Sequence, residues 1–296
     1  MLPVVVALLG ATEALAALGA VLRARHDGLT LEPQLAERLD AVLDALGVHD
    51  AVTALDEDET TALLGIVEGF LAQSADFVVS PGRKGWDHEQ PSILMAQGHS
   101  SVMVAELLRR FVVPALGDLS ARLDDERAAF LDIGAGVAAL AVAMCRLWPS
   151  LRVVGIDPWA PALALARERV SEAGLEERIE LRQAVAETLD DQARYDLAWV
   201  PTFFISGTVL DRVIERVHAA LRPGGWATLG LYAAPDIPLA GAVTDLRTVR
   251  HGGAMQTPQE MAAQMVRAGF SDVDVLFDAA WGRPMMFVAG RRTEAS

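Results

Sequence analysis

Residues Phe130 to Pro149, FLDIGAGVAALAVAMCRLWP, decide the fold that this sequence predicts. The stretch begins as a short apolar strand, turns at Gly134-Ala135-Gly136, and continues with apolar residues at helical spacing. Glycines let the backbone approach a ligand closely, and the helix that follows offers unpaired N–H groups. A second apolar strand ends in Asp157, twenty-one residues after Gly136, where a ribose-binding carboxylate is expected. The stretch therefore predicts a site for a nucleotide-like ligand.

The composition indicates an acidic globular protein. The 296 residues are 52% hydrophobic and carry a formal net charge of −15. A chain of this length can bury a large core, and its charge disfavours a nucleic-acid partner because phosphates would be repelled. The single cysteine, Cys145, excludes a disulfide within the chain and a cysteine-based zinc site. The histidines and acids show no compact ligand spacing, so no metal is expected.

The first 22 residues carry a single charged side chain, Glu13. An apolar run of this length raises the question of a membrane helix. The positive charges of Arg23 and Arg25 follow the apolar run, whereas those of a signal peptide precede it. We therefore expect a buried or oligomer-forming helix in a cytoplasmic protein that makes no membrane contact. Residues 1–25 are the expected contact of a homodimer.

The sequence divides into a helical part and an α/β part. Only helices are expected up to about residue 117, and from Ala128 apolar strands alternate with helices, as in a doubly wound sheet. We place the boundary between residues 1–120, a helical domain expected to cover the substrate or to dimerise, and residues 121–296, an α/β domain. The last two strands are joined by a short link and can pair antiparallel. The expected strands are 129–133, 152–156, 178–183, 194–200, 225–231, 272–277 and 284–290, and the expected helices of this domain are 137–148, 160–173, 208–221, 240–250 and 258–268.

The glycine turn by itself fits two cofactors. Gly134-x-Gly136-x-x-Ala139 satisfies the dinucleotide pattern of NAD enzymes. However, Asp132 lies at the strand end two residues before the first glycine, where a carboxylate can receive an ammonium group. Downstream, the strand Tyr195–Val200 runs into Pro201, and a helix ends in the run LRPGG before the next strand.

In these features the sequence resembles the class I S-adenosylmethionine-dependent methyltransferases, over about residues 120–291. The resemblance rests on four motifs in order: LDIGAG (131–136), VVGID (153–157), RYDLAWV (194–200) and LRPGGW (221–226). Ala138 stands where many members have a third glycine. The resemblance implies a Rossmann-like sheet of seven strands with the last strand antiparallel. It also implies methyl transfer from S-adenosyl-L-methionine to a small organic molecule, with release of S-adenosyl-L-homocysteine.

The resemblance also assigns roles to residues. Asp132 and the backbone of 134–136 would hold the methionine end of the cofactor, and Asp157 would bind both ribose hydroxyls. The acid that binds the adenine amino group in many members is missing at positions 184–186, which leaves Gln183, Glu187 or backbone groups for this role. The predicted cofactor-binding residues are Asp132, Gly134, Ala135, Gly136, Asp157, Pro158, Trp159, Val185, Ala186, Glu187 and Pro201.

Methyl transfer from a sulfonium is an in-line displacement, so the enzyme must align the reactants and needs a base only for a protonated nucleophile. The candidate catalytic residues are His99, His251 and Tyr232, for which solvated or packing roles are the alternative. Residues 202–204 are expected to border the reacting centre. The residues that either line an apolar acceptor pocket or fill the core are Trp86, Trp281, Met285 and Met286.

Two other functions stay open at this point. One is an NAD-binding oxidoreductase, and the other is a methyltransferase-like protein that binds the cofactor or a partner without catalysis. The acceptor, and whether its O, N or C atom is methylated, do not follow from the residues. An acidic protein with an apolar pocket favours a neutral or cationic acceptor.

Overall fold

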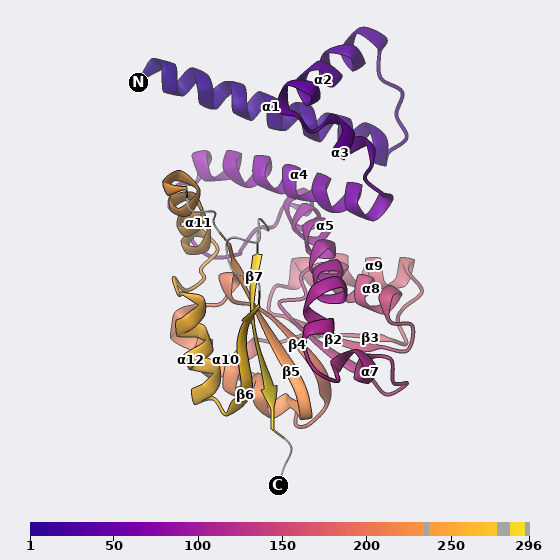
Figure 1. The fold of residues 1–296 in the computed structure, drawn as a ribbon, viewed down its shortest axis with the longest axis vertical. Coiled ribbons are helices and arrows are strands. Elements are labelled where there is room, and N and C mark those ends of the chain that lie inside the picture. The colour runs from indigo at the N-terminus through magenta and orange to yellow at the C-terminus, as the bar shows by residue number, and fades with distance from the viewer. Residues whose placement is uncertain (234–236, 277–284, 294–296) are drawn as a thin grey trace. The chain divides into compact units, whose positions relative to one another are not determined.

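The computed structural model describes residues 1–233, 237–276 and 285–293, and it separates into two compact units (Figure 1). The first unit is Met1–Pro81 with Gln90–Val104, and the second is Gly82–Glu89 with Ala105–Ser296. The division predicted at residue 120 thus differs from the observed one in two places. The loop 82–89 and the segment from Ala105 belong with the sheet, because side chains of both contact residues of the strands or of the loops that follow them.

The first unit is entirely helical. Its core gathers apolar side chains from four of its helices, among them Leu22, Leu43, Val52 and Leu64. A capping box at Asp56, which we expected from the sequence DEDE, begins the fourth helix. The helices are α1 (Leu2–His26), α2 (Pro33–Leu46), α3 (His49–Thr53), α4 (Glu57–Val79) and α5 (Pro91–Leu107), whose last turn belongs to the second unit.

Helix α1 has two different halves. Its C-terminal half is packed: Leu22 is fully buried, Arg23 pairs with Glu68 of α4, and Arg25 donates to the carbonyl oxygen of Leu55 at 2.9 Å. Its first half is exposed although it is apolar, so the expected burial of this helix holds for one half only. By length and hydropathy α1 and α4 are each able to cross a bilayer, a property that core helices of soluble proteins share.

The second unit is the predicted doubly wound sheet. The strand order is β3-β2-β1-β4-β5-β7-β6, and β7 runs antiparallel to both of its neighbours, which confirms the predicted fold class. Helices α10 and α12 pack on one face and α8 and α9 on the other (Figure 1). The strands are β1 (Ala129–Ile133), β2 (Arg152–Asp157), β3 (Ile179–Gln183), β4 (Tyr195–Pro201), β5 (Leu221–Tyr232), β6 (Phe270–Leu276) and β7 (Met285–Arg292). The helices are α6 (Val113–Ala115), α7 (Leu119–Leu123), α8 (Ala139–Leu147), α9 (Ala160–Glu172), α10 (Gly207–Ala220), α11 (Pro238–Arg250) and α12 (Pro258–Arg267). A π-helical turn, η1 (Leu108–Val112), and two 3-10 turns, η2 (Ala186–Thr188) and η3 (Thr202–Phe204), complete the unit.

The turn between β1 and α8 contains three residues in the left-handed region: Gly134 (φ 69°), Gly136 (φ 55°) and Ala138 (φ 58°). Glycine adopts this conformation freely, whereas a side chain makes it cost roughly 1–2 kcal/mol. Burial of the Ala138 methyl group offsets about 0.8 kcal/mol of this strain. Because a left-handed residue cannot continue a helix, α8 begins at Ala139, two residues later than the sequence predicts.

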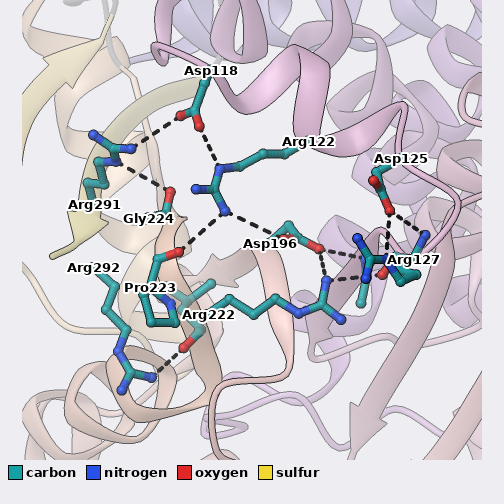
Figure 2. Close-up of polar contacts among 12 residues, drawn as sticks. Asp118, Arg122, Asp125, Arg127, Asp196, Arg222, Pro223, Gly224, Arg291 and Arg292 are labelled. Atoms are coloured by element: carbon teal, nitrogen blue, oxygen red, sulfur yellow. Dashed lines mark hydrogen bonds and ion pairs between the residues drawn. The ribbon is translucent and has the colours of Figure 1, made fainter. Parts of the chain in front are cut away.

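A buried carboxylate holds the amino-terminal edge of the sheet together (Figure 2). Asp196 of β4 accepts a hydrogen bond from the backbone N–H of Ala129 at 3.0 Å and pairs with Arg222 of β5. Arg122 of α7 lies 3.9 Å from the same carboxylate and 2.8 Å from Asp118. Strands β1, β4 and β5 and helix α7 are therefore joined at one point, which is why this helix belongs with the sheet.

Replacing Asp196 with alanine should lower the free energy of unfolding by about 2–4 kcal/mol, because a partly buried N–H and a partly buried arginine lose their acceptor. The matched control is Asp211→Ala, whose 67% exposed carboxylate lies 3.8 Å from Arg267. It should change stability by less than about 0.5 kcal/mol. Urea denaturation measures both, and equal losses would refute the assignment of the network to stability.

Candidate functional site

The predicted cofactor-binding residues meet at the carboxyl-terminal edge of the sheet, where parallel strands present their ends to a ligand. The backbone N–H groups of Gly134 and Ala135 donate to the carbonyl oxygen of Ile156, at 2.8 and 3.1 Å. A Cβ atom on Gly134 would lie 3.5 Å from Cγ of Pro201, so the proline borders the glycine turn. The turn is thus tied to β2 on one side and lies against the end of β4 on the other.

Asp157 is held by two backbone donors. One carboxylate oxygen accepts from the N–H of Gly136 at 2.8 Å, and the other accepts from the N–H of Trp159 at 2.7 Å. Burial raises the pKa of Asp157, while these two hydrogen bonds lower it. A carboxylate has about four acceptor positions, so two hydroxyl groups of a ligand can bind beside the backbone donors.

Asp132 is the most unusual group of this edge. Its side chain is buried, and its Oδ2 atom has no hydrogen-bond partner within the described part of the chain. Burial, and to a smaller extent the negative charge of Asp157, raise the pKa of Asp132 to about 8. A buried carboxyl oxygen without a partner is costly, which indicates a place for a cationic group of a ligand.

The segment after β3 lies next to Asp157, because Gln183 is its register partner on the neighbouring strand. The backbone N–H of Ala184 donates to the carbonyl oxygen of Asp157 at 3.2 Å, and Nε2 of Gln183 donates to that of Pro158 at 3.4 Å. Val185 is 39% exposed, and the predicted residues Ala186 and Glu187 follow it in the turn η2. Contact of this segment with adenine stays a prediction.

Two of the three candidate catalytic residues are brought together. The Tyr232 hydroxyl lies 3.1 Å from Nδ1 of His251. Burial, followed by the positive charges of Arg247 and Arg250, lowers the pKa of His251 to about 3. Burial raises the pKa of Tyr232. His251 is therefore neutral near pH 7 and able to accept the tyrosine proton in a hydrogen bond. A general base works best with a pKa near the operating pH, so a catalytic role for this pair stays a prediction.

His99 lies in the other unit, on α5, where its ring centroid is 6.5 Å from that of His26. The second unit therefore does not contain it, and its role stays a prediction. Of the residues considered for the acceptor pocket, Met285 and Met286 lie on β7 opposite Tyr232 and Leu231, whereas Trp281 lies outside the described residues.

An aromatic cluster, which the sequence did not predict as a unit, includes the Tyr232–His251 pair. Phe203 stacks on Tyr232 with ring centroids 4.1 Å apart, and Phe204 stacks on His251 at 5.0 Å. Trp86 contacts Phe204 at 4.9 Å and His251 at 5.3 Å. We call these five residues the aromatic cluster. It joins four segments that are far apart in sequence, which is why no local pattern could reveal it.

We also searched the described residues for a metal site. Within residues 1–233, 237–276 and 285–293, no group of three or more His, Cys, Asp or Glu side chains is arranged to hold an ion.

Comparisons with known proteins agree with this geometry. Residues 130–225 match the family model described as "Methyltransferase domain". The release factor glutamine methyltransferase of Geobacter sulfurreducens is 33% identical over 123 residues, which are 41% of this chain and 34% of that protein. The chain thus matches about a third of the length of this curated relative.

Several solved structures share the fold over nearly the whole chain. The S-adenosylmethionine-dependent methyltransferase SibL in its apo form is 23% identical with a TM-score of 0.63, over 99% of this chain and 100% of that one. The mitomycin 7-O-methyltransferase MmcR is 21% identical with a TM-score of 0.62, over 98% and 97%. The pyocyanin biosynthetic protein PhzM is 15% identical with a TM-score of 0.66, over 98% and 97%. With the strand order and the four sequence motifs, the family match confirms the resemblance: residues 130–225 form a methyltransferase domain of the class I, S-adenosylmethionine-dependent type.

Proposed function

We propose that the protein is an enzyme that transfers a methyl group from S-adenosylmethionine to a small organic molecule and releases S-adenosylhomocysteine. The observation that carries this proposal is the buried Oδ2 atom of Asp132, which has no partner in the described part of the chain, beside the carboxylate of Asp157. A ligand with an ammonium group and a ribose satisfies both carboxyl groups. A dinucleotide could also place a ribose at Asp157, but it would bring a pyrophosphate to the glycine turn beside the Asp132 carboxyl, which like-charge repulsion disfavours.

When bound, the cofactor supplies a methyl group on a sulfonium, from which it can be displaced in line. Asp132 would hold the ammonium group, Asp157 the ribose hydroxyls, and the backbone of the glycine turn would allow close approach. The flat rings of the aromatic cluster support an acceptor that contains a ring. The hydrogen-bonded pair of Tyr232 and His251 can orient a polar group of that acceptor.

Two kinds of acceptor can be weighed. The solved structures of MmcR and PhzM are described as a mitomycin 7-O-methyltransferase and a pyocyanin biosynthetic protein, which supports a small molecule. The curated relative is described as acting on a release factor, but the match covers only 41% of this chain and 34% of that protein. The small molecule is therefore the better proposal, and the atom that is methylated follows from neither comparison.

We also propose that the chain acts in the cytoplasm as a homodimer whose contact includes the first half of α1. An apolar helix surface in water is stabilised when a second copy covers it. The exposed apolar residues that support this contact are Leu2, Val4, Val5, Val6, Leu8 and Leu9.

Isothermal titration of the purified protein with S-adenosylhomocysteine should give one site per chain, and NAD(H) should give no signal. Asp157→Ala should weaken the affinity tenfold or more, because two hydrogen bonds to ribose are lost. Asp190→Ala, which removes an exposed acid after β3, should leave it unchanged. Preferential binding of NAD(H) would refute the proposal. Binding without methylation of any compound in a broad library would favour a non-catalytic role.

The affinity for S-adenosylhomocysteine should rise from pH 6 to pH 8, by up to about tenfold per pH unit. Below its pKa of about 8, the Asp132 carboxyl must release a proton to pair with the ammonium group. Asp132→Asn should remove this pH dependence and weaken binding at pH 8. Titration in buffers of different ionisation enthalpy measures the released proton, and an unchanged pH profile in the variant would argue against this role of Asp132.

The ligand-free Asp132→Asn variant should also be more stable than the natural protein at pH 8. Stability from Asp132 is present below its ordinary pKa of 3.8 and is lost as the pH rises through about 8, because burial opposes ionisation in the folded chain. The difference in melting temperature between the two proteins should therefore grow from pH 5 to pH 8.

Light scattering after gel filtration should give twice the chain mass of 31.6 kDa at micromolar concentration. Leu8→Glu should shift the mass toward the monomer, because a charge would enter the apolar contact. Leu46→Glu, which alters a 48% exposed leucine at the end of α2, is the matched control and should remain dimeric. A monomer that cosediments with phosphatidylcholine vesicles would speak against the dimer.

A further inference from the structure

The loop Gly82–Glu89, which we call the Trp86 loop, belongs to the sheet unit although the chain on both sides of it belongs to the helical unit. Three kinds of contact hold it there. The backbone N–H of Gly85 donates to the carbonyl oxygen of Arg250 at 2.8 Å. A Cβ atom on Gly252 would lie 3.3 Å from Cα of Gly85, so the two backbones approach closely.

The second contact is made by a single side chain of the cofactor edge. The indole N–H of Trp159 donates to the carbonyl oxygen of His88 at 2.7 Å. The third contact is Trp86 itself, whose ring packs in the aromatic cluster against Phe204 and His251. The Trp86 loop therefore reaches from the cofactor edge to the proposed acceptor side.

Trp159 takes part in both sites through different atoms. Its backbone N–H donates to Asp157 at 2.7 Å, and its indole N–H donates to the Trp86 loop at the same distance. The residue also precedes the first turn of α9, where its extended conformation (φ −89°, ψ 101°) directs the chain into the helix. A ligand that immobilises Asp157 and the backbone of Trp159 therefore also restricts the indole N–H that holds the Trp86 loop.

We propose that Trp159 is a positioning residue that couples occupation of the Asp157 site to ordering of the Trp86 loop, so that the acceptor side is completed once the cofactor is in place. This inference rests on the proposed function. By linkage the coupling is reciprocal: an ordered loop must also favour the cofactor, by the same factor by which the cofactor favours the ordered loop.

Hydrogen exchange of the full chain with and without saturating S-adenosylhomocysteine tests the coupling. In the natural protein, the ligand should slow exchange in the Trp86 loop about fivefold or more, most clearly at the Gly85 amide that donates to Arg250. No slowing in a protein that binds the ligand would overturn the coupling. Failure to bind the ligand would instead remove the proposed function on which it rests.

Trp159→Phe tests whether the indole N–H carries the coupling, because it removes the N–H donor and keeps a smaller aromatic ring in its place. Because the coupling is reciprocal, this variant should bind the ligand about three- to tenfold more weakly, and at saturation exchange in the loop should be slowed less than about twofold. The matched control is Trp226→Phe, since the buried indole nitrogen of Trp226 has no hydrogen-bond partner among the described residues. The control should behave like the natural protein. If the Trp159 variant keeps the full slowing, the ligand shields the loop by another route and the proposal fails.

The reciprocal test starts from the loop and leaves Trp159 in place. Trp86→Leu removes the ring that packs in the aromatic cluster and should weaken binding of S-adenosylhomocysteine about three- to tenfold. Isothermal titration measures this change. An unchanged affinity in a folded variant would overturn the coupling even if Trp159→Phe could not be purified.

Discussion

The two backbone hydrogen bonds to Asp157 are the constraint on which the candidate site depends. They tie the glycine turn after β1 and the residue that precedes α9 to one carboxylate at the end of β2. The same carboxylate is the group that would read a ribose. The geometry of the ligand site and the local structure of the sheet edge are therefore stabilised by the same atoms, and one cannot shift without the other.

Asp132 illustrates the cost of such an arrangement. Its buried carboxyl opposes folding when it is ionised and becomes useful only beside a cation. The amino-terminal edge of the sheet shows the opposite solution, since Asp196 is buried with an N–H group and two arginines around it. Asp196, whose partners the protein itself supplies, thus contributes to stability. Asp132, whose buried oxygen has no partner among the described residues, is the one suited to binding a ligand.

The sequence predicts those parts of the molecule that depend on residues close together in the chain. The apolar runs of β1, β2 and β4 and the glycines of the turn have one physical interpretation, and the strand order follows from the motifs they belong to. The structure differs from the prediction where a contact between residues far apart in the sequence determines the local conformation. Strand β5 begins at Leu221, four residues earlier than expected, because Leu221 pairs with Tyr195 before a register shift that admits the glycines of LRPGG. Gly225 approaches the carbonyl oxygen of Tyr195 so closely that a Cβ atom would lie 2.9 Å from it.

The same distinction separates the two halves of the candidate site. The cofactor edge is built from residues 132–136 and 157–159, two short stretches whose spacing is visible in the sequence. The acceptor side is built from Trp86, residues 203–204, Tyr232 and His251, which no spacing relates. The class of reaction is therefore carried by local motifs, whereas the choice of acceptor is carried by contacts that only the folded chain brings together.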